Sequence, residues 1–199
     1  MRLFYLILCL IMCATGSVHA KNQTPPLSMD YPAWSTTKRS FKRKGYRPSA
    51  SQPLVNLETE MLTTYGRSTK QPQKVVEVSR RTKRKGLLEN RTAVFFEQRF
   101  VKLSQVVVFS VKQRQNVVET IRTLEEGFIG QPGVLYEAAT EGRSARWQYQ
   151  TAQELVRISI LMDDEGGVLK VDRSIKGSEE TLEQYRRHVV ARLSKTRKG

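Results

Sequence analysis

ELVRISILMDDEGGVLKVDRSI, residues 154–175, holds two runs of alternating apolar and polar residues around an acidic, glycine-containing stretch. Neighbouring side chains on a strand point to opposite faces, so the apolar residues at every second position from Val156 would share one face. Acidic residues followed by glycine, as in 163–167, are typical of a turn. The pattern therefore predicts an antiparallel hairpin of strands 154–162 and 168–174.

Further strand patterns lie upstream of this hairpin. Residues 145–149 alternate between small or aromatic residues and polar ones, and 134–136 begin another extended run. Residues 106–111 are mostly β-branched and bounded by polar residues, which favours a buried strand. Residues 92–104 are apolar in places but fit a helix and a strand equally well.

Two stretches have helical periodicity instead. Residues 113–126 carry an apolar stripe, and we expect this helix to end at Gly127 in a left-handed cap. A second helix is predicted to begin at Ser178, whose side chain would cap it. Residues 92–199 are thus expected to form an α+β domain, an antiparallel meander of about four to five strands covered on one face by these two helices.

The preceding residues have a different composition. Residues 21–91, the basic arm, hold 16 Lys and Arg against 5 Asp and Glu, whereas residues 92–199 hold 17 against 14. Like-charge repulsion and low apolar content oppose burial, so the arm is predicted to be largely disordered. Within it, the apolar spacing of 54–65 predicts a short helix, and 74–78 is a candidate edge strand.

Residues 1–20 have the features of a secretory signal peptide. A basic start precedes an apolar run, and small residues precede a predicted cleavage after Ala20. The run is too short for a membrane span, which needs about 20 apolar residues. Cleavage would remove Cys9 and Cys13, leaving an exported, cysteine-free chain in the periplasm or outside the cell, without a transmembrane segment. Disulfides and cysteine chemistry would then be excluded.

No catalytic constellation is evident in the sequence, and we expect a binding protein rather than an enzyme. His188 is predicted to be a surface residue, and Trp147 and Tyr149 to be core residues. Asp163, Asp164 and Glu165 fit a turn better than a cation site. We therefore expect no metal and no cofactor, and we identify no catalytic residue.

The net charge of +15 points to anionic partners. Clustered Lys and Arg attract polyanions through counterion release, although no specific nucleic-acid motif is present. For an exported protein the expected partners are lipopolysaccharide, anionic lipid, an acidic glycan or an envelope protein. The predicted anion-binding residues are Lys38, Arg39, Lys42, Arg43, Lys44, Arg80, Arg81, Lys83, Arg84 and Lys85.

The sequence therefore predicts an exported, non-enzymatic binding or cell-envelope accessory protein whose cationic arm engages an anionic surface or partner. One alternative is a carboxylate-dependent envelope hydrolase that uses the acidic residues 163–165. Another is a secreted eukaryotic precursor cleaved after Arg84, because residues 81–84 match a convertase pattern and Asn22 and Asn90 begin glycosylation sequons.

Overall fold

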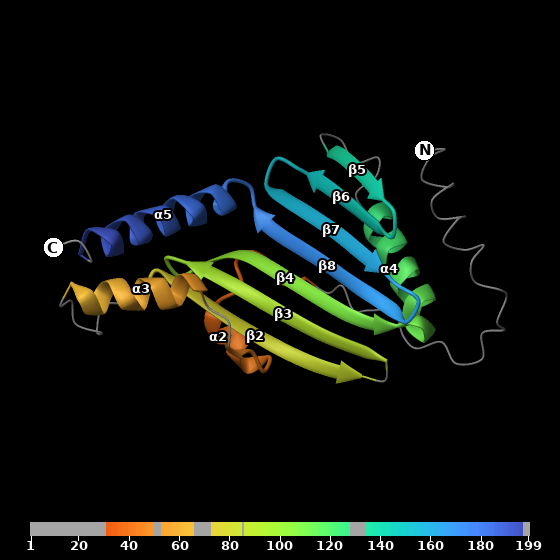
Figure 1. Ribbon diagram of the computed structural model, residues 1–199, viewed down its shortest axis with the longest axis horizontal. Helices are drawn as coiled ribbons and strands as arrows, with labels where there is room; N and C mark the ends of the chain where they lie inside the picture. The colour runs from red at the N-terminus through yellow and green to blue at the C-terminus, as the bar shows by residue number, and fades with distance from the viewer. Residues whose placement is uncertain (1–30, 50–52, 66–72, 85, 128–133, 197–199) are drawn as a thin grey trace.

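The computed structural model describes residues 31–49, 53–65, 73–84, 86–127 and 134–196 (Figure 1). The predicted signal peptide and Lys85 lie outside these ranges. Along the chain the elements are α2 Lys38–Arg43, β1 Arg47–Pro48, α3 Pro53–Thr64, β2 Val75–Arg84, β3 Leu87–Phe96, β4 Arg99–Ser110, a 3₁₀ turn Val111–Gln113, α4 Arg114–Glu126, β5 Leu135–Glu141, β6 Ser144–Gln150, β7 Glu154–Met162, β8 Gly166–Ile175 and α5 Ser178–Thr196.

The strands form one antiparallel sheet in the order β1-β2-β3-β4-β8-β7-β6-β5. It consists of two meanders, β1 to β4 and β5 to β8, which join where β4 pairs with β8. The α+β class and the hairpin of β7 and β8 are confirmed. The sheet has eight strands, however, so the prediction of four to five is wrong. The additional strands come from the basic arm and from residues 92–104, where charged side chains obscure the period of two.

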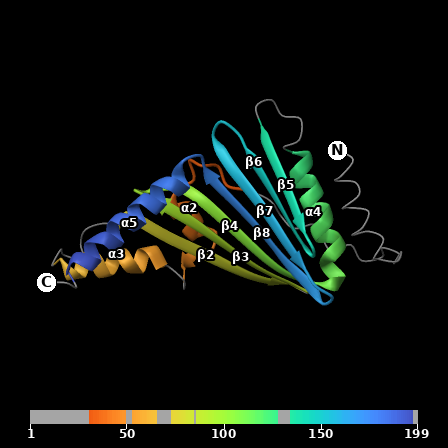
Figure 2. The same ribbon diagram turned by 45° about the horizontal axis from the view of Figure 1, so that its top comes forward.

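The helices lie on both faces of the sheet. Helices α2 and α4 pack on one face, which we call the helix-covered face, and α3 and α5 lie side by side at one end of the opposite face (Figures 1 and 2). Phe96 of β3 contacts the Tyr185 ring of α5 at 5.4 Å between centroids. The prediction that both long helices cover the same face is therefore wrong. We call the remainder of the opposite face the open face.

Much of the basic arm is ordered. Helices α2 and α3, strands β1 and β2 and the first half of β3 all lie within residues 21–91, so the prediction of a largely disordered arm is wrong for its described part. Phe41 of α2 and Tyr46 are buried against Phe95 and Phe100, and these four aromatic side chains supply the burial that charge alone would oppose. Helix α3 confirms the predicted helix over 54–65.

The core under α4 confirms the predicted inward faces. The buried cluster contains Trp147 and Tyr149 of β6 together with alternate residues of β7 and β8 and the α4 stripe. Two helix-end predictions are wrong. Gly127 ends α4 with φ −71°, in the right-handed region. The Ser178 hydroxyl donates to the Ile175 carbonyl at 2.6 Å, with the Val101 carbonyl as a second, longer acceptor at 3.2 Å, so its side chain ties α5 to the sheet instead of capping it.

Candidate anion-binding site

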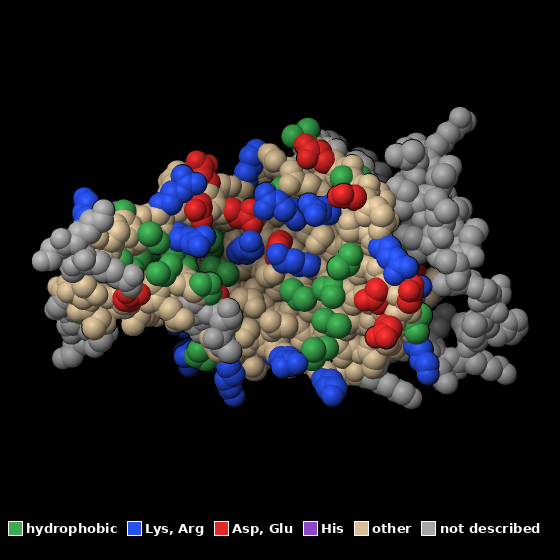
Figure 3. Space-filling model, in the orientation of Figure 1, with side chains coloured by type: hydrophobic (Ala, Val, Ile, Leu, Met, Phe, Trp, Pro, Cys, Tyr) green, Lys and Arg blue, Asp and Glu red, His purple; other side chains and the backbone are tan. Residues whose placement is uncertain are grey.

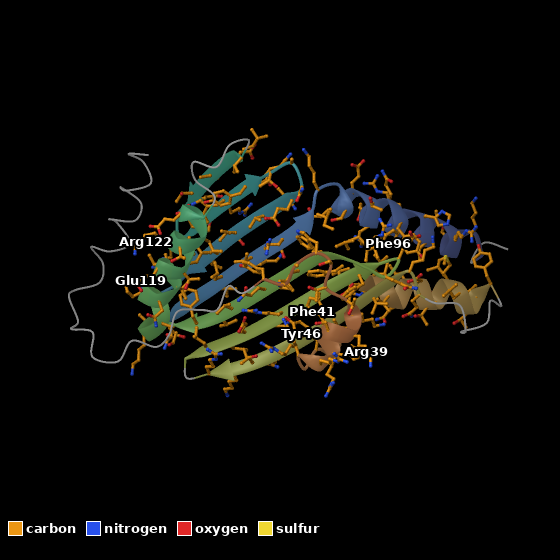
Figure 4. All side chains as sticks on the ribbon, turned by 180° about the vertical axis from the view of Figure 1, so that it is seen from behind. Arg39, Phe41, Tyr46, Phe96, Glu119 and Arg122 are labelled. Atoms are coloured by element: carbon orange, nitrogen blue, oxygen red, sulfur yellow. The ribbon has the colours of Figure 1, made fainter. Side chains whose placement is uncertain are left out.

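Helix α2 presents the first predicted basic cluster. Thr37 caps it by accepting a hydrogen bond from the Ser40 N–H at 3.3 Å, and Phe41 anchors it to the sheet (Figure 4). Burial lowers the pKa of the Lys38 amine, and the nearby charge of Lys42 lowers it further. These cations repel one another, which a bound anion would relieve. The members of the cluster, of which only Lys38 is half-buried, are Lys38, Arg39, Lys42, Arg43 and Lys44.

Strand β2 divides the second predicted cluster between the two faces of the sheet. Arg80 and Arg84 lie on the helix-covered face, whereas Arg81 and Lys83 lie on the open face, because successive strand residues alternate. Lys85 is outside the described residues. The ten predicted residues therefore do not form a single surface.

A hollow of about 260 Å³ lies between α2 and β2, and we call it the basic hollow. Its lining includes Lys44, Arg80, Arg84 and Arg91. Arg80 Nη1 donates to the Lys44 carbonyl at 3.1 Å, and the Arg80 guanidinium lies 5.6 Å from the centre of the Tyr46 ring. The Arg80 Nε is buried and has no hydrogen-bond partner among the described residues. Folding thus joins members of two clusters that are far apart in the sequence.

A partly buried ion pair lies at the base of the basic hollow. Arg91 Nε donates to a Glu89 carboxylate that also accepts from Gln105 Nε2 at 2.8 Å. Burial raises the pKa of Tyr46, so its phenol stays protonated at neutral pH. Arg91 is not among the anion-binding residues predicted from the sequence. The signal was its position two residues before Ala93, on the inward face of a strand.

The arrangement suits binding of an anion. Guanidinium groups form paired, charge-assisted hydrogen bonds with carboxylate and phosphate oxygens. The four cations of the basic hollow outnumber its carboxylate, Glu89, which is already engaged. The volume exceeds the roughly 30 Å³ that one water occupies in the liquid, so a charged group of several heavy atoms fits.

The other candidate residues predicted from the sequence lie at an exposed helix position and in a turn. His188 is exposed on α5. Asp163 Oδ1 accepts from the N–H groups of Glu165 and Gly166, at 2.9 and 2.8 Å, which confirms the predicted turn. Asp164 pairs with Arg143 at 3.2 Å. Within the described ranges, no group of three or more His, Cys, Asp or Glu side chains is placed to hold a metal ion.

One buried acid lies outside all of these predictions. Glu125 of α4 is 2% exposed, and its Oε1 accepts from the Tyr149 hydroxyl at 2.8 Å, while its Oε2 has no partner in the described part of the chain. Burial raises the pKa of Glu125 from 4.5 to about 7, and the Tyr149 hydrogen bond opposes that rise. Its position four residues after Ile121, on the apolar stripe, was the available signal.

The Glu125 carboxyl should make stability depend on pH. Because the folded protein holds this proton more tightly than the unfolded chain, the stabilisation is complete below pH 4.5 and is lost as pH rises through about 7. Glu125→Gln is therefore expected to raise the free energy of unfolding at pH 8 by up to about 3 kcal/mol, and by almost nothing at pH 4. Urea denaturation of both proteins at the two pH values measures this. An equal change in the free energy of unfolding at pH 4 and pH 8 would contradict a raised pKa for Glu125.

No helix of the described residues is long and apolar enough to cross a membrane. Comparisons of the chain with protein-family models, with curated proteins and with solved structures found no match.

Proposed function

We propose that this is an exported, non-enzymatic binding protein that holds an anionic surface or polyanion, with the basic hollow as the principal contact site. The observation that carries the proposal is the convergence of Lys44, Arg80, Arg84 and Arg91 around one hollow. Export rests on the signal-like residues 1–20. In that compartment, lipopolysaccharide, anionic lipid and acidic glycans supply the phosphate, carboxylate and sulfate groups that guanidinium binds best.

The geometry also supports a site rather than a merely basic surface. Arg80 is held by the Lys44 carbonyl and by the Tyr46 ring, so little side-chain entropy remains to be lost when an anion binds. Its buried Nε, which has no partner among the described residues, has a hydrogen bond to gain. Lys44 and Arg84 are exposed at the rim, where they would meet a polyanion first.

Heparin, a soluble polyanion, tests the proposal by calorimetric titration at increasing NaCl. The site variant is Lys44→Gln/Arg84→Gln. The matched control is Arg81→Gln/Lys83→Gln, which removes the same charge from exposed positions on the open face. Loss of two ionic contacts should weaken binding about tenfold at low salt and reduce the slope of log Kd against log salt by about two. The control should change binding much less.

Two results would reject the proposal in different ways. No binding of heparin by the unmodified protein at low salt would remove the polyanion function. Equal weakening in the two double variants would show that net charge alone is recognised, and the basic hollow would lose its role as the principal site.

A further inference from the structure

The open face is arranged in rows that cross the strands. Leu88, Val108, Val168 and Leu161 are successive register partners on β3, β4, β8 and β7, and we call them the apolar row. Val108 is 45% exposed and Leu161 is 58% exposed. Strands about 4.8 Å apart make this row about 14 Å long. All four side chains line a hollow of about 450 Å³.

This exposure is unusual for a sheet face that meets solvent. The solvent side of an antiparallel sheet is normally polar, and contiguous exposed apolar side chains mark binding surfaces. Figure 3 looks onto this face and shows hydrophobic side chains gathered beside a band of Lys and Arg. The apolar row thus requires an explanation other than core packing.

A polar row runs directly beside the apolar row. The row consists of three register partners, Lys170 on β8, Ser159 on β7 and Arg146 on β6. Each lies two residues along its strand from the level of the apolar row, a distance of about 7 Å. These three side chains, the polar row, line a second hollow of about 710 Å³. Apolar and cationic surfaces therefore adjoin on the same face.

Four cations, Lys102, Arg146, Arg157 and Lys170, and two acids, Glu137 and Asp172, line the hollow of the polar row. Lys170 pairs with Asp172 at 2.8 Å. Lys102 and Arg157 both pair with Glu179, and the distance from Lys102 to Glu179 is 2.8 Å. Arg146 is exposed and has no ion pair among the described residues. Arg146 on β6 is diagonal to Leu161 on the neighbouring strand β7. A cation that has no ion pair within the described ranges therefore lies at the end of the apolar row.

We propose that the open face binds a single-chain anionic amphiphile of the fatty-acid class, with its acyl chain along the apolar row and its anionic head at Arg146 and Lys170. This site lies on the opposite face of the sheet from the basic hollow and does not depend on the function proposed there, and Arg84, at the end of β2, lines both hollows. The ligand class follows from charge complementarity: an apolar chain covers the row, and its head supplies the negative charge that Arg146 lacks. Asp163, two residues beyond Leu161, and Glu165 line the hollow of the apolar row on the side away from the polar row. These acids would repel an anionic head, which places the head at Arg146 and Lys170.

Calorimetric titration of the full chain with dodecanoate, below its micelle-forming concentration, tests the proposal. Dodecyltrimethylammonium, which carries an equal alkyl chain and a positive head, tests the head-group preference, and acetate tests the head alone. The row variant is Val108→Thr/Leu161→Gln. Val190→Thr is the matched control, because Val190 is 45% exposed, as is Val108, but lies on α5.

The expected result is dodecanoate binding that the row variant weakens about tenfold, as loss of apolar contact on two side chains requires. Val190→Thr should leave it unchanged. Arg146→Gln should weaken dodecanoate binding without weakening binding of the cationic amphiphile. Leu161→Gln alone, at the more exposed position, should cause part of the loss of dodecanoate affinity. This single variant keeps the test valid if the double variant does not fold.

Any of four outcomes would overturn the inference: absence of dodecanoate binding, equal affinity for the two amphiphiles, no loss in the row variants, or self-association that the row variant abolishes. Heparin binding by the row variant should stay as in the unmodified protein. Failure of this inference is thereby distinguishable from failure of the basic hollow.

Discussion

Glu58→Ala is expected to lower the free energy of unfolding by about 4 kcal/mol. The substitution removes a carboxylate that accepts three hydrogen bonds, so all three donors lose their acceptor. Glu58 of α3 is 2% exposed. Its carboxylate accepts from the Lys74 and Val75 N–H groups at 2.8 and 3.1 Å and from the Tyr185 hydroxyl at 2.7 Å. One side chain thus joins α3, the start of β2 and α5, and its loss leaves the buried Val75 N–H without a partner.

Hydrogen exchange and urea denaturation together measure this effect. Exchange should accelerate first in α3, α5 and the start of β2, since these elements share the carboxylate. Glu60→Ala, at an exposed position two residues along the same helix, is the control and should change stability by less than about 0.5 kcal/mol. Equal exchange rates in Glu58→Ala and the unmodified protein would show that the carboxylate does not hold these elements together.

Gly166→Ala is expected to destabilise the protein by about 3 kcal/mol, since an added Cβ cannot be accommodated without moving two strands. Gly166 begins β8 opposite Ser110 at the end of β4. A Cβ there would lie 1.9 Å from the Phe109 carbonyl oxygen and 2.9 Å from the Ser110 Cα. Both are backbone atoms, so rotation of a side chain cannot relieve the overlap.

Thermal or urea denaturation of Gly166→Ala gives the measurement, with Gly142→Ala as the control. Gly142 has φ +54°, and a Cβ added there would have no described atom within 4 Å, so alanine should cost only about 1 kcal/mol of backbone strain. If the two variants lost equal stability, close approach of β4 and β8 would not be the reason for glycine at 166.

The prediction of individual elements from sequence succeeded where the apolar period was uninterrupted. The β7–β8 hairpin and helix α4 were predicted because their inward residues recur at two and at about 3.6 positions respectively. Strand β2 was predicted only over 74–78, because its second half, RRTKR, has charged residues on both faces. Its pairing with β3 over ten residues supplies hydrogen bonds that no periodicity records.

The candidate sites were predicted less completely. The sequence indicated that Lys44, Arg80 and Arg84 bind anions, but it grouped them with Arg81 and Lys83, which lie on the other face. It missed Arg91 and the apolar row altogether. A row across four strands consists of residues that are neighbours in register and distant along the chain, so no local pattern contains it.

Local patterns in the chain were sufficient for the α+β class, the helices over 54–65 and 113–126 and the β7–β8 hairpin, because each depends on residues close together in the sequence. The strongly basic charge follows from composition alone. Long-range contacts alone established that β4 joins β8, that α4 and α5 lie on opposite faces, and that two basic clusters meet at one hollow. Periodicity fixes which way a side chain points, whereas its neighbours across the sheet are chosen by long-range strand pairing and by burial of aromatic residues such as Phe41.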